Sequence, residues 1–241
     1  MTSPSPEFVA LRDRALVCID CGLSETRTNV VFGVGDVGAR LMLVGEAPGK
    51  NEDLQGEPFV GAAGALLDEL LAGIGISRDL VYIANVLKCR PPGNRDPRLD
   101  EIEACKGYLR EQIRMIRPEV VVTLGNFATK LLLRTETGIT RLRGQRFKWW
   151  MGATLVPTFH PAAALRGRPQ VRADMEADFQ TVKAILDETS DSMPPSPPTA
   201  GLGPAASAAV SPPVERGEYR AEPGEGGTFD DDEVDQLELF S

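Results

Sequence analysis

The chain alternates between short, almost continuous apolar runs and longer stretches in which apolar residues recur at helical spacing. A continuous apolar run of this length is typical of a strand that is buried on both faces. Four such runs predict strands at residues 40–45, 80–86, 119–124 and 153–159. Helical spacing is clearest in residues 62–74, which carry one apolar stripe made of Leu66, Leu67, Leu70, Leu71 and Ile74.

The remaining elements complete an alternating order of strands and helices. Helices are predicted at residues 98–116, 126–134 and 171–188, helical spacing also marks residues 8–21, and residues 139–150 predict a hairpin around Arg143 and Gly144. Strands that alternate with helices indicate a parallel sheet with helices on both faces. The sequence therefore predicts an α/β fold, a three-layer α/β/α sandwich around a four-stranded, parallel, doubly wound sheet.

Polar and glycine-rich loops follow all four predicted strands. The first loop reads GEAPGKNEDLQGEPFVG over residues 45–61, and the others begin NVLKCRPPGNR, GN and HP. In a doubly wound fold such loops meet at the carboxyl edge of the sheet, where ligands bind. We therefore expect a functional site there. The alternative is that the first loop is a long surface connection whose charges are solvated.

The composition divides the chain into a body and a tail. We expect residues 1–7 to be frayed, residues 8–190 to form one domain, and residues 191–241, which are rich in Pro, Ser, Ala, Gly and acids, to be a disordered acidic tail. The tail holds 11 acids and 2 bases, a net charge of −9, so the body holds 35 − 11 = 24 acids and 26 − 2 = 24 bases. The acidic balance belongs to the tail and does not exclude a nucleic-acid partner for the body.

The sequence offers no sign of a membrane or secreted protein. No apolar run approaches the ~20 residues of a membrane span, and the first residues, MTSPSPEF, lack the basic and apolar regions of a signal peptide. We expect a cytoplasmic, nucleoid-associated monomer.

Four cysteines stand at spacings that suggest a metal site. They are Cys18, Cys21, Cys89 and Cys105, with a C-x2-C pair at the start. Two disulfides are rare in a cytoplasmic chain, so metal binding is the favoured interpretation. Zinc and an iron–sulfur cluster both accept four thiolates, and the spacing does not distinguish them. The alternative is that the later two are small buried residues and the first pair is a chance motif.

Taken together, these motifs resemble those of the family-4 uracil-DNA glycosylases of bacteria and archaea. The resemblance spans residues 17–187 and rests on GEAPGKNEDLQGEPFVGAAG, NVLKCRPPGNRDP, HPAAALR and the four cysteines. It implies hydrolysis of the N-glycosidic bond of deoxyuridine in DNA, the start of base-excision repair. It also implies a [4Fe–4S] cluster held by the four cysteines, for which we expect a structural role.

The resemblance gives three residues a role at the base. A base must be flipped out of the duplex before its glycosidic bond can be reached. Phe59 is then expected to stack on uracil, and the Asn85 amide to pair with O4 and N3–H. His160, the only histidine, is expected to donate to O2 as charge develops there. Without the resemblance, a turn asparagine and a structural histidine are the alternatives.

Several residues are candidates for positioning the attacking water. Other uracil glycosylases use an aspartate, and the matching place is Ala47, which we expect beside the uracil. The remaining candidates are Glu46, Glu52 and Asn94, of which Glu52 is favoured and Glu46 is next. Each is alternatively a loop residue that accepts bonds from backbone N–H groups.

Other residues are expected to contact DNA or a protein partner. Leu165 resembles the wedge that fills the space of the flipped base; the candidates for phosphate contacts are Arg166, Arg168, Arg90, Arg95 and Lys130.

The last residues resemble the pentapeptide with which bacterial repair proteins bind the β sliding clamp: Gln236, Leu237, Glu238, Leu239 and Phe240. The alternatives for this segment are a chance apolar end or a strand that folds back on the body.

Two other functions compete with the glycosylase. One is a DNA-binding damage sensor without activity, which the alanine at position 47 leaves open. The other is a glycosylase with another specificity, such as hypoxanthine or uracil crosslinking. Crosslinking relatives carry a basic insertion with a histidine after the second loop, which NRDP at residues 94–97 lacks.

Overall fold

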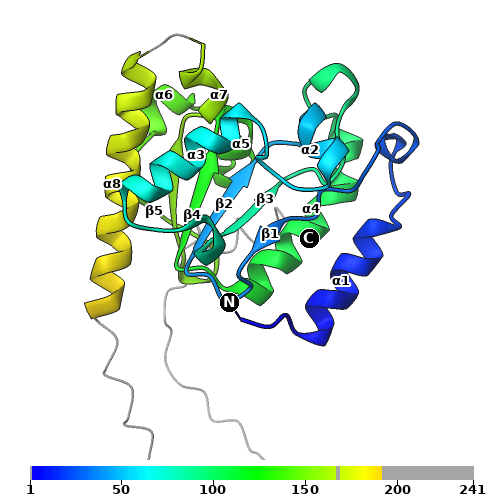
Figure 1. Ribbon diagram of the computed structural model, residues 1–241, viewed down its shortest axis with the longest axis horizontal. Coiled ribbons are helices and arrows are strands. Elements are labelled where there is room, and N and C mark those ends of the chain that lie inside the picture. Colours follow the sequence, from blue (N-terminus) through cyan, green and yellow to red (C-terminus); the bar gives the residue numbers. More distant parts are fainter. Residues whose placement is uncertain (1, 167–168, 192–241) are drawn as a thin grey trace, which may run out of the picture.

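The computed structural model describes residues 2–166 and 169–191 (Figure 1). Its helices are α1 (Pro6–Leu16), α2 (Lys50–Gln55), α3 (Ala62–Gly73), α4 (Leu99–Ile116), α5 (Asn126–Leu133), α6 (Ile139–Leu142), α7 (Pro161–Ala164) and α8 (Pro169–Asp191). Its strands are β1 (Val34–Gly35), β2 (Leu41–Gly45), β3 (Tyr82–Asn85), β4 (Val120–Leu124), β5 (Phe147–Lys148) and β6 (Thr154–Thr158). None of the described helices combines the length and the apolar character that a membrane crossing requires.

The strands form a single sheet in the order β1-β3-β2-β4-β6-β5. The four central strands are parallel, which confirms the predicted doubly wound sheet, and the two-residue strands β1 and β5 add antiparallel edges that were not predicted. In the register of β2 and β3, Gly45 lies beside Asn85. The last residues of these two strands are therefore neighbours at the carboxyl edge of the sheet.

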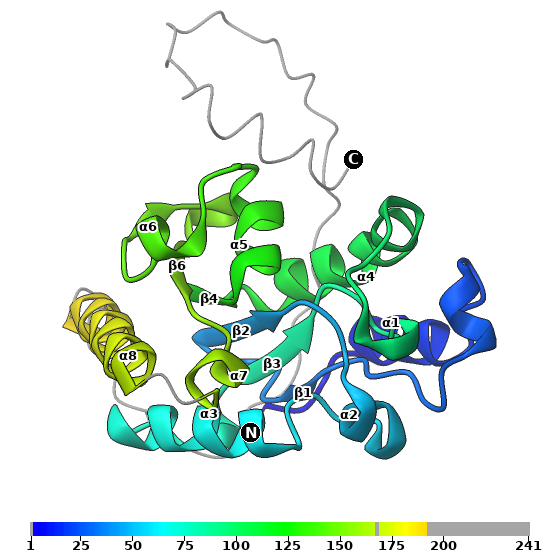
Figure 2. The same cartoon turned by 90° about the horizontal axis from the view of Figure 1, so that it is seen from above.

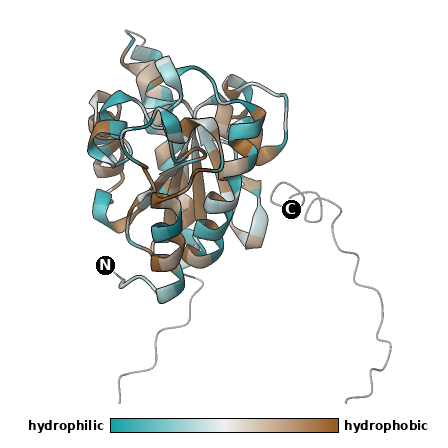
Figure 3. Ribbon diagram, turned by 90° about the vertical axis from the view of Figure 1, so that its right-hand side faces the viewer, coloured by the Kyte–Doolittle hydropathy of each residue, from teal (hydrophilic) through white to brown (hydrophobic). Residues whose placement is uncertain are grey.

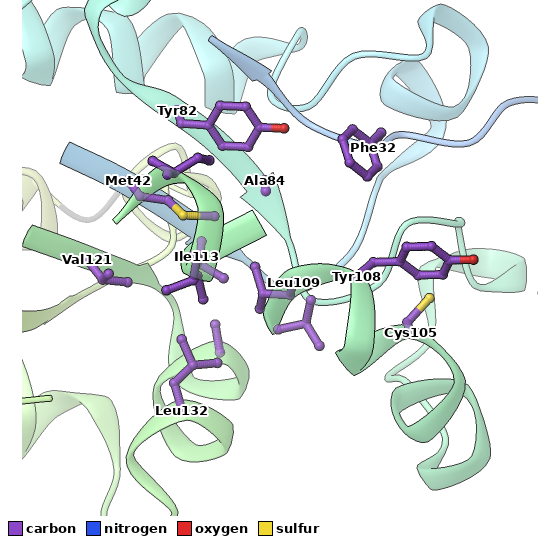
Figure 4. Close-up of a cluster of buried hydrophobic side chains, with 14 of the residues drawn as sticks. Phe32, Met42, Tyr82, Ala84, Cys105, Tyr108, Leu109, Ile113, Val121 and Leu132 are labelled. Carbon is purple, nitrogen blue, oxygen red and sulfur yellow. The ribbon is translucent and has the colours of Figure 1, made fainter. Parts of the chain in front are cut away.

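Both faces of the sheet are covered, which explains the continuous apolar runs. Leu41 and Leu43 of β2 face α3 and α8, whereas Met42 and Val44 face α1, α4 and α5. Figure 2 shows α3 and α8 on one side of the strands and α4 and α5 on the other. In Figure 3 the apolar strands lie inside a shell of amphipathic helices, and Figure 4 shows Met42 of β2 in the buried cluster beneath α4.

The chain reverses its winding between β2 and β4. After β2 and the short α2, helix α3 packs on one face of the sheet, whereas α5, which follows β4, lies on the opposite face. In open α/β sheets the loops diverge at such a point, and ligands bind there. The fold thus directs the β2–α3 loop, the end of β3 and the segment after β6 toward one site.

The predicted hairpin over residues 139–150 is wrong in position. Residues 139–142 form α6 instead, whose first amide donates to Asn126 Oδ1 at 3.0 Å. The hairpin joins β5 to β6 and turns at Met151 and Gly152, both with positive φ angles of 58° and 80°. A two-residue strand and a four-residue helix are too short to leave a period in the sequence.

Two further elements begin where loops were expected. Helix α1 starts at Pro6, within the segment expected to be frayed, because Ser5 caps it by accepting a hydrogen bond from the Phe8 amide at 3.2 Å. Helix α2 lies inside the first loop and ends at Gly56 in the left-handed conformation, with a φ of 76°.

Candidate active site

Three side chains from separate loops meet at the carboxyl edge of the sheet. A Cβ atom added to Gly45 would lie 2.3 Å from Asn85 Oδ1 and 2.9 Å from Phe59 Cζ, so Phe59 and Asn85 both border this glycine. The rings of Phe59 and His160 are stacked, with centroids 5.6 Å apart and planes inclined by 29°. The fold therefore brings together the three residues that the sequence predicted to contact the base, and Gly45 completes the group.

The side-chain amide of Asn85 is buried and has an unused hydrogen-bonding atom. Its side chain is 2% exposed, and its Oδ1 atom accepts no hydrogen bond from any described residue. A buried polar atom without a partner costs free energy, so proteins rarely retain one without a function. The amide therefore offers a buried hydrogen-bonding group to a ligand.

His160 is held as a neutral hydrogen-bond donor. Its Nδ1 accepts the Ala162 amide at 3.2 Å at the start of α7, so the proton of the neutral ring lies on Nε2. Burial lowers the pKa of His160, a negative charge at Glu52 opposes the shift, and Arg166 adds to it. The side chain is thus arranged to donate from Nε2 without carrying a charge.

Three acids of the first loop differ in burial and in their hydrogen-bond partners. Glu52 Oε1 accepts the Val60 amide at 3.2 Å. Burial raises the pKa of Glu46, and the nearby Asp96 raises it further. Asp53 is 4% exposed, and its Oδ1 accepts the backbone N–H groups of residues 28 and 29, which ties the loop to the segment after the first two cysteines.

Ala47 is half-buried and packs against the hydrophobic core.

The residues of the second loop are held together by hydrogen bonds. Arg90 Nε donates to the Asn94 side chain at 2.7 Å, and Asn94 is exposed with a positive φ of 54°. Arg95 pairs with the buried carboxylate of Glu101, so its guanidinium braces the start of α4.

The segment after His160 presents an apolar side chain and a cation to solvent. Leu165 is 50% exposed at the end of α7, and Arg166 beside it is also exposed. Lys130 pairs with Glu136 at 2.9 Å. Arg168 and the C-terminal pentapeptide lie outside the described residues.

The four cysteines, which are far apart in sequence, line one small pocket. They are Cys18 and Cys21 after α1, Cys89 after β3, and Cys105 on α4. Figure 4 shows Cys105 at the end of the buried cluster, beside Tyr108. Burial raises the pKa of the Cys89 thiol and raises that of Cys105 to about 12, so both sulfurs are protonated at neutral pH unless a metal displaces the protons.

Two basic side chains accompany these thiols. Arg27 Nη1 donates to Cys89 Sγ at 3.4 Å, and Lys88 lines the same pocket. Within residues 2–166 and 169–191, no three His, Cys, Asp or Glu side chains form a group that could hold a single metal ion. The site is therefore a cysteine-lined pocket with a cationic border.

Lys88 is a residue that the sequence reasoning missed. It is 2% exposed, and its Nζ donates to the backbone oxygen of Asn85 at 2.8 Å and to Gln112 Oε1 at 2.7 Å. Burial lowers its pKa to about 7, and the nearby thiols of Cys105 and Cys89 oppose the shift. The one signal in the sequence is its position directly after the apolar run that contains Asn85.

The sequence model of the uracil DNA glycosylase superfamily matches residues 32–186. The chain belongs to the uracil-DNA glycosylase superfamily. It is 49% identical over 172 residues to the type-4 uracil-DNA glycosylase of Archaeoglobus fulgidus, a match that covers 68% of this chain and 86% of the relative. Two further type-4 relatives, from Sulfurisphaera tokodaii and Saccharolobus solfataricus, are each 45% identical and cover 73% of this chain and 83% and 85% of the relatives.

Family membership accounts for the fold and for the place of the candidate site. The matched residues include all four parallel strands and the loops that carry Phe59, Asn85 and His160. The C-terminal tail lies outside the match. The superfamily model thus covers the sheet and the candidate site, whereas Cys18, Cys21 and the C-terminal tail lie outside the matched residues.

Proposed function

We propose that this protein is a uracil-DNA glycosylase, a hydrolase of DNA repair that removes uracil from deoxyuridine in DNA. The observation that carries the proposal is the buried Asn85 Oδ1 atom, which has no partner among the described residues and lies beside Gly45; Phe59 also borders this glycine and stacks on His160. An amide, an aromatic face and an imidazole donor together match the polar edge, the flat face and the O2 atom of one pyrimidine.

The Asn85 amide selects the base. Its two ends, one donor and one acceptor, pair with O4 and N3–H of uracil, whereas cytosine presents the opposite pattern at these atoms. A site that buries a polar reader rejects the wrong base strongly, because the mismatched base leaves that reader without a bond. Phe59 provides the stacking face, and Gly45 lets the Asn85 amide and the Phe59 ring come close together, because a Cβ atom at this position would lie within 3 Å of both.

His160 stabilises the leaving group. When the C1′–N1 bond breaks, its electron pair moves into the uracil ring and negative charge develops on O2. A neutral imidazole that donates from Nε2 stabilises this charge where it forms, and the loss of one such donor typically costs about 10²–10³-fold in rate. The bond from Ala162 to Nδ1 fixes the required tautomer.

Glu46 is the better candidate to activate the water. Glu52, favoured from the sequence, uses Oε1 to accept the Val60 amide, and the Asn94 oxygen accepts from Arg90. Glu46 directly follows Gly45, and its raised pKa makes it a stronger base than an exposed carboxylate. In this proposal the water oxygen bonds to C1′, and its proton passes to Glu46.

The four cysteines are proposed to hold a [4Fe–4S] cluster. Each cysteine of such a cluster binds a different iron, so the four sulfurs surround a pocket rather than one ion. The thiols line such a pocket, and the guanidinium of Arg27, which donates to Cys89 Sγ, would suit the negative charge of the ligated cluster. Cluster formation would tie the N-terminal segment to α4 and to the second loop, which is a structural role.

Purified protein tests the cluster directly. A brown protein with iron and sulfide supports the proposal, and a colourless protein with zinc contradicts it. Cys89→Ala is expected to lower both iron content and thermal stability, while Ser24→Ala, in the same pocket, keeps the iron. Full activity in a preparation without the cluster would exclude the bracing role.

The C-terminal pentapeptide is proposed to bind the β sliding clamp. It follows residues 191–235, which would tether the enzyme to the clamp and raise its local concentration at replicating DNA in the cytoplasm. A peptide of residues 230–241 should bind the clamp, and the same peptide with Phe240→Ala should not. Equal binding of both, or no binding at ~100 μM, a weak affinity by this scale, would remove the idea.

Labelled oligonucleotides test the main proposal. Substrates with U:G, U:A, single-stranded uracil or hypoxanthine are incubated with the protein and cleaved with alkali at abasic sites. Breaks at uracil alone are expected, with strong loss in Asn85→Ala and parental activity in Gln180→Ala on the surface of α8. Tight binding without breaks would instead indicate a damage sensor, and breaks at hypoxanthine another specificity.

A further inference from the structure

Phe59 has an unusual backbone for a large residue. Its φ angle is 54°, in the left-handed region that favours glycine, although its side chain is 7% exposed and packed. An aromatic residue in this region is strained and persists only where its surroundings hold it. The surroundings of Phe59 therefore determine its conformation.

The peptide groups on both sides of Phe59 are held by charged side chains. Before it, the Pro58 carbonyl accepts from Arg78 Nη2 at 2.6 Å. After it, the Val60 N–H donates to Glu52 Oε1 at 3.2 Å. Helix α3 closes the third side, because a Cβ atom on Gly64 would lie 1.7 Å from the Phe59 oxygen.

We propose that Arg78 and Glu52 are positioning residues that fix the left-handed backbone of Phe59 and thereby the plane on which uracil stacks. Neither residue needs to touch the base. Arg78 lies outside the glycine-rich loop, in the turn before β3, and reaches back across 20 residues to Pro58. The expected effect on uracil removal rests on the proposed function, whereas the positioning of the Phe59 backbone does not.

The bonds of Arg78 and Glu52 also account for the stacking of Phe59 on His160. With its backbone in the left-handed region, Phe59 directs its ring toward Gly45 and stacks it on His160. If the Pro58 carbonyl is released, the strained residue can relax to a negative φ angle, which moves the ring. A small misplacement of a binding group can reduce the rate of a reaction substantially.

Arg78 also pairs with Asp68, which supplies a matched control. Arg78 Nη1 lies 2.8 Å from Asp68 Oδ1, and this ion pair is partly exposed. Arg78→Met removes both the ion pair and the bond to Pro58, whereas Asp68→Asn removes only the charge of the partner. A difference between the two variants therefore reports the bond to Pro58.

The first readout does not depend on activity. The chain contains a single histidine, so the imidazole proton signals in NMR belong to His160, and the stacked Phe59 ring shifts them. Arg78→Met is expected to move these signals toward their positions in Phe59→Leu, while Asp68→Asn leaves them in place. Unchanged signals in Arg78→Met would overturn the proposal, whether or not the protein removes uracil.

A double-mutant cycle gives the second readout. Arg78→Met should lower kcat/KM on uracil-containing DNA by about tenfold or more, and by less than about twofold when Phe59 is already alanine. Asp68→Asn should stay within about twofold of the parent. An equal loss in both backgrounds, or an equal loss in Asp68→Asn, would show that Arg78 does not act through Phe59.

Glu52 is tested by two variants, which also serve if Arg78→Met fails to fold. Glu52→Gln keeps an oxygen for the Val60 amide, and Glu52→Met does not, whereas both lose the charge near His160. The His160 signals should move further in Glu52→Met than in Glu52→Gln. Identical spectra would exclude a role for the bond to Val60.

Discussion

Lys88 Nζ donates a hydrogen bond of 2.8 Å to the backbone oxygen of Asn85, the residue proposed to read uracil. Lys88 directly precedes Cys89, so a single buried side chain connects the cysteine pocket to the amide reader. The second bond of Lys88, to Gln112, fixes the ammonium from the side of α4. Asn85 is therefore placed by the core beneath it and by the register of β3 with β2.

Replacement of Lys88 by methionine should weaken both the fold and the selection of uracil. The variant keeps the length of the side chain but leaves the Asn85 oxygen and Gln112 Oε1 without a donor. An unsatisfied buried acceptor costs about 1–3 kcal/mol of the free energy of unfolding. Denaturant unfolding should show that loss, and kcat/KM should fall. Lys183→Met, which removes an exposed pair with Asp187, should change neither.

Alanine at position 45 should block the site without unfolding the protein. The added Cβ would lie 2.3 Å from Asn85 Oδ1 and 2.9 Å from Phe59 Cζ, so the amide and the ring that are proposed to hold the base would have to move. We expect kcat/KM to fall by about 10²-fold or more. Gly107→Ala on α4 meets no atom within 4 Å and should leave activity unchanged, with stability raised by up to about 1 kcal/mol. Parental activity in Gly45→Ala would place the base elsewhere.

The stability of the folded protein should depend on pH through the protonation of His160. Burial lowers its pKa below the ordinary value of 6.5, so the folded protein binds this proton less tightly than the unfolded chain. The contribution of the neutral ring to stability is complete above pH 6.5 and is lost as the pH falls through the lower folded pKa. NMR titration of the single histidine should give a midpoint below 6.5, and a midpoint at or above 6.5 contradicts the assignment.

Glu52 supplies the internal control for that titration. Its negative charge supports the protonated ring and opposes the effect of burial. Glu52→Gln should therefore lower the pKa of His160 further, with a more acidic midpoint in the same NMR experiment. A midpoint that moves upward would show that the carboxylate does not act on the imidazole.

The layered fold could be predicted because its strands are buried on both faces. A strand in that setting needs apolar residues at every position, as in residues 41–44, and such runs are visible in a sequence. The meeting of Phe59, Asn85 and His160 followed from the same reasoning, since parallel strands end at one edge. The hairpin was misplaced because β5 pairs through only two residues, which leaves no alternation to detect.

The supporting contacts of the site could not be predicted. Lysine is usually exposed, so nothing in the composition distinguishes Lys88 from a surface residue. The bond from Arg78 to Pro58 depends on how the turn before β3 lies against the first loop, which is a tertiary relationship. The sequence favoured Glu52 for positioning the water. Its bond to the Val60 amide could not be foreseen, because that contact depends on the path of the loop after Gly56.

The segment that carries His160 is anchored by a buried carboxylate on α8. Asp178 is 2% exposed, accepts the Thr158 hydroxyl at 2.7 Å and pairs with Arg143 at 2.7 Å. Arg143 in turn lies over the Phe159 ring, 5.8 Å from its centroid. Thr158 and Phe159 directly precede His160, so the ion pair fixes the start of the catalytic segment from outside the site.

Asp178→Ala should therefore reduce stability and kcat together. Breaking a buried pair on one side costs about 3–5 kcal/mol; we expect about 2 kcal/mol or more, because the Arg143 side chain is 22% exposed and regains water. Asp187→Ala, which breaks the exposed pair with Lys183, should cost less than about 0.5 kcal/mol and leave kcat unchanged. Since Asp178 touches no substrate, KM should change less than kcat. A variant that loses stability but keeps the parental kcat well below its unfolding temperature would show that His160 is held by its own cap at Ala162 alone.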